Sequence, residues 1–227
     1  MGYVSACLFI VISVIHLAGC IVENTKLCTV TKPMLMPLLA LTAASVLYPH
    51  FQDAKLTLVF TLTALAWGTA GDVLLLLPGE KPFIAGALCF LAGHLFWIGQ
   101  FCSAYASLSA PAAAAGIVCI AGLLTAAYVM LGKPKGVMGA GVIVYGAILC
   151  TLVFTGIVSV YAAHSRSAVL FLSGAVLFLV SDSMLGYTVM KKTFPLSHVL
   201  IMFTYIAAQT LLTAAAVLPH MQSAAGL

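Results

Sequence analysis

The sequence predicts an all-α integral membrane protein, a bundle of about eight transmembrane helices that forms one domain over residues 1–227. Hydrophobic residues make up 63% of the 227 residues, charged residues make up only 6%, and the mean hydropathy is +1.20. Soluble domains are about one quarter charged, so this composition excludes a soluble fold. The apolar runs are long enough for helices, and no alternating ten-residue pattern indicates a barrel.

Turn-forming residues separate most of the apolar runs. The predicted spans cover residues 3–22, 33–49, 56–77, 82–103, 111–131, 137–160, 166–189 and 198–218. Three of the turns are marked by Pro78-Gly79, Gly132-Lys133-Pro134 and Phe194-Pro195. The first run lacks a basic leader and a small-residue cleavage site, so we expect a retained helix. The second span is short and contains Pro33 and Pro37.

Positive charge is distributed unevenly between the two sets of loops. With eight spans, seven of the nine Lys and Arg residues lie at the ends of spans one, three, five and seven, namely Lys26, Lys32, Lys81, Lys133, Lys135, Lys191 and Lys192. The opposite loops contain Lys55 and Arg166. This bias predicts that the Lys-rich loops face the cytoplasm and that both termini lie outside. The net charge of +4 therefore indicates orientation and not a nucleic-acid partner.

Two aspartates lie inside apolar runs. Asp72 is found in WGTAGDVLLLLP and Asp182 in GAVLFLVSDSMLGYTVM, whereas the other three acidic residues fall in predicted loops. A carboxylate at bilayer depth costs roughly 2.5–3.5 kcal/mol, so we interpret both as functional. Each follows a small residue and precedes a Lys-containing loop and another span, which suggests a parallel repeat of four plus four helices. Bonding to a neighbouring helix is the structural alternative for each aspartate.

Polar residues gather at one depth below the Lys-rich end. At about 1.5 Å per residue, Asp72 lies roughly five residues and Asp182 roughly eight residues from that end. Further polar residues of this layer are Lys32 at the mouth of the second span, Tyr145, Tyr205, and the deeper His94 and Gln209. We expect one polar pocket that opens towards the Lys-rich end, because scattered buried charges would be unpaired. Simpler interpretations are core packing for the tyrosines and His94, and extension to the headgroups for Lys32.

The polar residues lie in six short segments: TKPMLMPLLA (31–40), AGDVLLLLP (70–78), AGHLFW (92–97), VYGAILC (144–150), LVSDSMLGY (179–187) and HVLIMFTYIAAQTLL (198–212). Together these segments resemble one known family, the YhhN-like lysoplasmalogenases. The resemblance implies an eight-span enzyme that hydrolyses the vinyl ether of lysoplasmalogens to a fatty aldehyde and glycerophosphoethanolamine or glycerophosphocholine. The family pattern falls on Lys32, Asp72, His94, Tyr145, Asp182, Tyr205 and Gln209. Ile206 departs from it, since family members often have a second tyrosine there.

The chemistry of a vinyl ether fits two buried carboxyl groups. Protonation of the β-carbon gives an oxocarbenium ion, to which water adds, so the catalyst needs one neutral acid and one carboxylate. Asp72 and Asp182 can divide these roles, as the two carboxyl groups of glycosidases do, and the sequence leaves the assignment open. The remaining candidates are substrate-binding groups: Lys32 for the phosphate, Tyr145, Tyr205 and Gln209 for the polar backbone, and His94 to orient an aspartate or water. The expected partner is a single-chain ether lysophospholipid in the membrane.

Two other functions are open at this point. A proton-coupled transporter of a small molecule or lipid would use the same carboxylates and would give flux without aldehyde release. A metal-dependent hydrolase would use His16, His94 and His198 with an aspartate, but these histidines lack an HxxxH or HExxH spacing. We therefore expect no metal and no other cofactor. The seven cysteines are an odd number without a CxxC pair, and we expect reduced, buried thiols.

Overall fold

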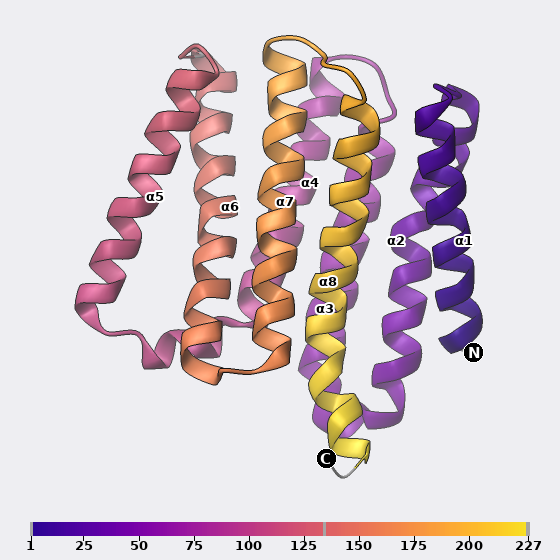
Figure 1. Ribbon diagram of the computed structural model, residues 1–227, viewed down its shortest axis with the longest axis vertical. Helices are drawn as coiled ribbons and strands as arrows, with labels where there is room; N and C mark the ends of the chain where they lie inside the picture. The colour runs from indigo at the N-terminus through magenta and orange to yellow at the C-terminus, as the bar shows by residue number, and fades with distance from the viewer. Residues whose placement is uncertain (1, 134, 226–227) are drawn as a thin grey trace.

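The computed structural model describes residues 2–133 and 135–225 and contains eight long α-helices that run roughly side by side (Figure 1). In chain order they are α1 (Gly2–Ile21), α2 (Thr25–Leu47), α3 (Phe51–Leu74), α4 (Glu80–Gln100), α5 (Ala110–Met130), α6 (Gly136–Ala163), α7 (Arg166–Met190) and α8 (Ser197–Ala225). Two short 3-10 helices, η1 (Tyr48–His50) and η2 (Cys102–Ser107), follow α2 and α4. The described residues contain no strand, which confirms the predicted all-α class. Pro134, part of a predicted turn, lies outside the described residues.

The helices have the length and composition of membrane spans. Seven helical stretches of the described chain are long and apolar enough to cross a bilayer, and one of them, Thr25–Leu74, contains both α2 and α3. The chain reverses direction at η1, where Pro49 lies, so that α2 and α3 pack side by side. The eight helices consequently alternate in direction, and α1 begins at the end of the bundle where α8 finishes (Figure 1). This is the multi-pass membrane bundle that the composition predicts.

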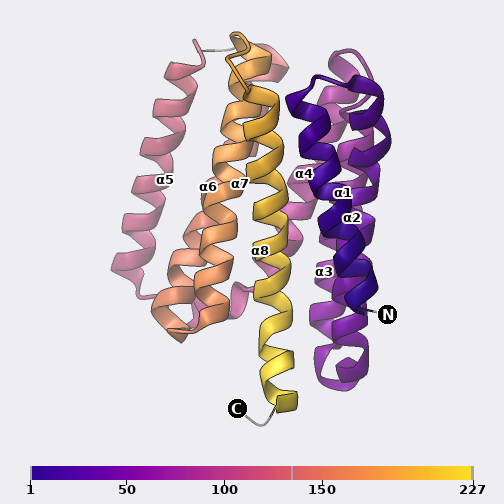
Figure 2. The ribbon, with the colours of Figure 1, turned by 45° about the vertical axis from the view of Figure 1, so that its right-hand side comes forward.

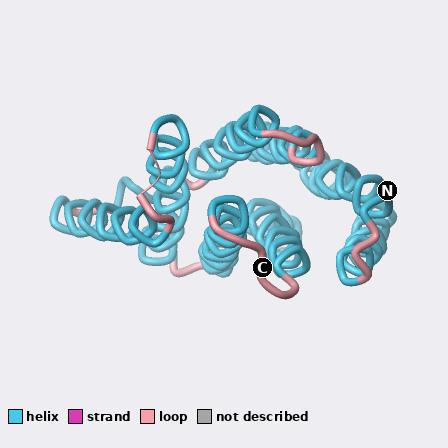
Figure 3. The backbone as a smooth tube through the Cα atoms, turned by 90° about the horizontal axis from the view of Figure 1, so that it is seen from above, coloured by secondary structure: helices cyan, strands magenta, loops and turns pink. Residues whose placement is uncertain are grey.

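The helices form an arc with the C-terminal helices on its inner side (Figure 3). Neighbours in sequence pack as hairpins except α4 and α5, and α8 packs in addition against α1, α2 and α3 (Figure 2). Helix α4 packs against α6 much as α8 packs against α2. The predicted four-plus-four repeat requires a two-fold axis that relates α1–α4 to α5–α8. Such an axis would exchange the α4–α6 contact with the α8–α2 contact. Helix α5 lies at the edge of the bundle beside α6.

Helix α2 begins earlier than the sequence predicts. The predicted second span starts at residue 33, whereas α2 starts at Thr25 and contains both prolines in its interior. The side chain of Asn24 accepts a hydrogen bond from the backbone N–H of Leu27 and caps the helix. This longer helix moves Lys32 from the mouth of the span to a position about two turns inside α2.

Glycines allow close packing in the two hairpins that contain the aspartates. A Cβ atom on Gly71 of α3 would lie 2.8 Å from the ring of Phe90 on α4, so only glycine fits there. In the second hairpin, a Cβ atom on Gly174 of α7 would lie 3.0 Å from the backbone oxygen of Ala208 on α8. Small residues at such contacts are typical of membrane helices, because association there depends on close packing.

The surface of the bundle is mostly apolar, as a lipid-facing surface must be. Exposed side chains include Ile10, Val14, Leu88, Ile117 and Phe203. All seven cysteines have free thiols, as expected. The expectation that they are buried is wrong for three of them, since Cys7, Cys102 and Cys119 are exposed.

Candidate active site

Asp72 and Asp182 line the same cavity, which has a volume of about 210 Å³. Asp72 lies on α3 and is 1% exposed, and Asp182 lies on α7 and is half-buried. The cavity wall also includes residues of α1, α2, α4 and α8. Two carboxyl groups that are 110 positions apart in the sequence therefore share one chamber. The chamber reaches Thr193 in the α7–α8 connection and Ser197 at the start of α8, near Lys191 and Lys192 at the Lys-rich end.

Asp72 is bound by two groups from neighbouring helices. The hydroxyl group of Tyr205 on α8 donates a hydrogen bond of 2.8 Å to Asp72 Oδ2. Lys32 Nζ on α2 lies 3.5 Å from Asp72 Oδ1, and the Lys32 side chain is 14% exposed. Among the described residues this is the only ion pair. A cation at this distance favours the charged form of the Asp72 carboxyl group.

Asp182 has a different environment. The hydroxyl group of Tyr145 on α6 donates a hydrogen bond to Asp182 Oδ2. No cation lies within ion-pair distance of Asp182 among the residues that the structure describes. A buried carboxyl group without a cation is more easily accommodated in its neutral form. The two aspartates thus resemble each other in position and differ in charge environment.

His94 and Gln209 lie behind the tyrosines rather than in the cavity wall. The ring of His94 packs edge-to-face against Phe178, with centroids 4.3 Å apart, and lies 5.8 Å from the ring of Tyr145. Gln209 is buried one turn beyond Tyr205, and a Cβ atom on Gly68 would lie 3.3 Å from Gln209 Nε2. Neither residue is among the described residues that line the cavity. His94 lies against Tyr145 and Gln209 lies one turn from Tyr205, so both can influence the site through the tyrosines.

Several residues of the cavity wall were not predicted from the sequence. The polar ones near the Lys-rich end are Thr188, Thr193, Ser197 and His198. A fifth polar residue of the wall is Ser181, whose hydroxyl group donates a hydrogen bond of 3.1 Å to the backbone oxygen of Ile201. His16 and Cys28 form another part of the wall. The sequence feature that could have identified Ser181 as a wall residue is its position next to Asp182. No sequence signal singles out the threonines, since such residues are common near helix ends.

The three histidines of the predicted metal hydrolase do not converge. His16 and His198 line the cavity, but His94 is packed against α6 and α7. The described residues therefore do not form the His16, His94 and His198 centre that was considered.

A second, apolar cavity of about 400 Å³ lies between α4, α6 and α7. Its wall includes Phe83, Leu88, Val144 and Met190, and it contains almost no polar side chain. Four residues belong to the walls of both cavities: Leu75, Phe90, Asp182 and Leu185. Asp182 therefore lies at the junction between a polar chamber and an apolar groove, whereas Asp72 faces the polar chamber alone.

Comparison with known proteins agrees with the resemblance seen in the sequence. Residues 27–216 match the YhhN family. The lysoplasmalogenase TMEM86B of Rattus norvegicus is 33% identical over 156 residues, which are 67% of this chain and 59% of that protein. The lysoplasmalogenase TMEM86B of Homo sapiens is 30% identical over 153 residues, which are 67% of this chain and 61% of that protein.

The match thus spans about three fifths of the length of these curated relatives. No solved structure matches the chain. The family match covers most of the chain and includes both aspartates and the residues bound to them. The chain is a member of the YhhN family.

Proposed function

We propose that this protein is a lysoplasmalogenase, an intramembrane hydrolase of the vinyl ether bond of lysoplasmalogens. The observation that carries the proposal is the position of Asp182, at the junction of the polar chamber and the apolar groove, with Asp72 on the polar side. A lysoplasmalogen has one polar headgroup and one hydrocarbon chain, and its vinyl ether lies where the two meet. The names of the curated relatives support the same activity.

The substrate would lie across the junction. Its hydrocarbon chain would occupy the groove between α4, α6 and α7, and its glycerophosphate would occupy the chamber. The rim of the chamber offers Thr188, Thr193, Ser197 and His198, whose hydrogen-bonding groups suit a phosphate.

With the Lys-rich loops in the cytoplasm, the headgroup would enter from that side. Labelling of cysteines introduced at Lys135 and Lys55 in intact cells would test this orientation.

We assign the acid to Asp182 and the base to Asp72. The β-carbon, which receives the proton, is the vinyl carbon nearer the hydrocarbon chain, and Asp182 is the aspartate that faces the groove. The α-carbon, which water attacks, is nearer the headgroup, on the side of Asp72. Lys32 and Tyr205 stabilise a carboxylate at Asp72, which is the form that a general base requires.

In the proposed cycle, Asp72 and Asp182 both regain the protonation states in which they began. Asp182 donates its proton to the β-carbon, and the oxocarbenium ion forms at the α-carbon. Water adds to that carbon while Asp72 accepts a proton from it, giving a hemiacetal. In the collapse, Asp72 returns its proton to the leaving glycerol oxygen and Asp182 accepts the hemiacetal hydroxyl proton, so the aldehyde and the alcohol form in the same step. Tyr145 and Tyr205 hold the two carboxyl groups in place throughout.

The experiment is aldehyde release from lysoplasmalogen by the purified protein, compared with Asp72→Asn, Asp182→Asn and the control Asp53→Asn. Asp53 is exposed in the first turn of α3, far along the helix from Asp72. A well-placed acid or base contributes about 10²–10⁴-fold, so each active-site variant should lose at least about 100-fold and the control should retain full activity. Proteoliposomes that show substrate flux without aldehyde release would refute the hydrolase and favour a transporter.

A further inference from the structure

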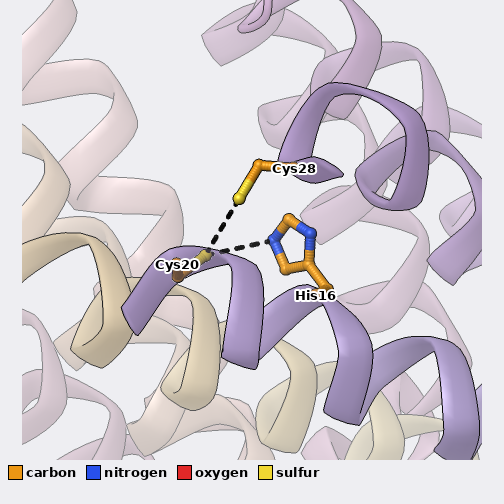
Figure 4. A group of neighbouring side chains, drawn as sticks. All are labelled: His16, Cys20 and Cys28. Carbon is orange, nitrogen blue, oxygen red and sulfur yellow. Dashed lines mark hydrogen bonds between the residues drawn. The ribbon is translucent and has the colours of Figure 1, made fainter. Parts of the chain in front are cut away.

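A second cluster of reactive side chains lies where α1 meets α2 (Figure 4). It consists of His16, Cys20 and Cys28, all of them buried. Cys20 Sγ lies 3.6 Å from His16 Nε2 and 3.7 Å from Cys28 Sγ. One ligand atom of each residue lies within 4.8 Å of the other two, so a single metal ion can reach all three with small side-chain rotations.

The hydrogen bonds around His16 leave its Nε2 free to bind a metal. The hydroxyl group of Thr31 donates to the backbone oxygen of Leu27 at 2.7 Å. Because a hydroxyl group has a single proton, Thr31 must accept the 2.7 Å hydrogen bond from His16 Nδ1. The proton of a neutral His16 is therefore on Nδ1, and the lone pair of Nε2 points towards Cys20. A hydrogen bond of this kind from the outer ring nitrogen is typical of histidine ligands of metals.

Two of the three ligand distances match those of a tetrahedral zinc site, and the third, between His16 and Cys28, is within 4.8 Å. Zinc bonds of about 2.3 Å to sulfur and about 2.0 Å to nitrogen place the ligands about 3.5 Å apart for nitrogen and sulfur and about 3.8 Å apart for two sulfurs. The pairs His16–Cys20 and Cys20–Cys28 are within 0.1 Å of these values, at 3.6 and 3.7 Å. We propose that His16, Cys20 and Cys28 bind a zinc ion through Nε2 and two thiolates.

The proposed zinc site forms part of the cavity wall. His16 and Cys28 both line the chamber that contains Asp72, so the fourth ligand would come from the chamber, as water or as an anionic group. The ion would fix α1 against α2. The family match begins at residue 27, so His16 and Cys20 lie outside it. Two of the three ligands lie on α1 and the third, Cys28, lies on α2 within the family match, and the zinc proposal does not depend on the hydrolase proposal.

The test is the zinc content of the purified full-length protein, measured by elemental analysis in detergent. We expect about one zinc ion per chain in the wild type. The double variant Cys20→Ser and Cys28→Ser should retain less than about one tenth of it, since loss of both thiolates removes most of the affinity. Cys150→Ser, which changes a buried cysteine on α6, is the matched control and should keep the full zinc content. Cobalt exchanged into the wild type should show a thiolate-to-metal charge-transfer band that the double variant lacks.

Three outcomes would overturn the proposal. The first is wild-type protein without zinc that also fails to take up cobalt. The second is zinc that persists in the double variant. The third is a Cys20–Cys28 disulfide in the protein as purified, detected by mass spectrometry, which would identify the cysteines as a redox pair. Because the double variant could fold poorly, His16→Gln is measured beside it. The unfolding midpoint of the metal-stripped wild type should rise when zinc is added back, and this rise should be absent in both variants. These measurements use no substrate, so their failure is distinct from failure of the hydrolase proposal.

Discussion

Replacing Lys32 by methionine separates two roles for this residue. From the sequence, Lys32 was expected to bind the substrate phosphate, which would affect KM. In the structure its ammonium group lies 3.5 Å from Asp72 Oδ1, which suggests that it keeps Asp72 charged. Methionine has a similar length and no charge, so the variant removes the cation and retains most of the packing.

The size of the effect follows from the ion pair. Two unit charges at this distance interact by about 5 kcal/mol at an effective dielectric constant of about 20. The Lys32 side chain is 14% exposed, so partial screening by water reduces this to about 3–4 kcal/mol, within the range of about 3–5 kcal/mol found when one partner of a buried pair is removed. In aldehyde release from lysoplasmalogen, kcat should therefore fall by about 10²- to 10³-fold.

Three comparisons with Lys32→Met distinguish the ion-pair role of Lys32 from the phosphate-binding role. Lys135→Met, in the α5–α6 connection, is the control and should keep full activity. The double variant Lys32→Met with Asp72→Asn should be no slower than Asp72→Asn alone, because the two residues act as one unit. Raising the pH should partly restore Lys32→Met, since alkali deprotonates a base that has lost its cation. A rise in KM with unchanged kcat would refute the ion-pair role and favour the phosphate role.

Two further predictions concern the helix packing and the apolar groove. Gly71→Ala would place a Cβ atom 2.8 Å from the ring of Phe90, so the variant should be destabilised by about 1–3 kcal/mol, seen as a lower unfolding midpoint in detergent. Gly122→Ala on α5, where no atom lies within 4 Å, should show no such loss, and equal melting of the two variants would contradict the packing argument. Gly141→Leu would extend a side chain from α6 into the apolar groove, raising KM for long-chain lysoplasmalogens more than for short-chain ones; an effect independent of chain length would argue against the groove as the chain-binding site.

The sequence predicts the helices well because long apolar runs leave few alternatives. The largest error is the start of α2, where the polar segment 25–32 resembles a loop. Two contacts that the composition of the segment does not reveal explain why it is helical. Asn24 caps the helix, and Lys32 pairs with Asp72 on another helix. A long-range partner of this kind cannot be read from local composition.

The sequence predicts the depth of the candidate site in the membrane but does not predict which side chains line the cavity. Counting residues from the Lys-rich end correctly brought Asp72 and Asp182 to one depth, because helical rise is constant. It placed His94 deeper but in the same pocket, whereas His94 lies outside the described cavity wall, packed against Phe178. Which side chains reach a cavity depends on rotation about the helix axis, and counting residues does not give this rotation. The cluster of His16, Cys20 and Cys28 was also missed. Its first two members follow helical spacing, but the third depends on the tight turn between α1 and α2.

The shared wall between chamber and groove has a consequence for what happens after bond cleavage. Once the ether is broken, the two fragments lie on different sides of Asp182, one among hydrogen-bonding groups and one among hydrocarbon. Each fragment would then have its own exit, the glycerophosphate to water past Thr193 and Ser197, and the aldehyde sideways into lipid between α4 and α6. Release in opposite directions would keep the reactive aldehyde within the bilayer and away from soluble amines, and would allow a membrane-bound enzyme to take it up directly.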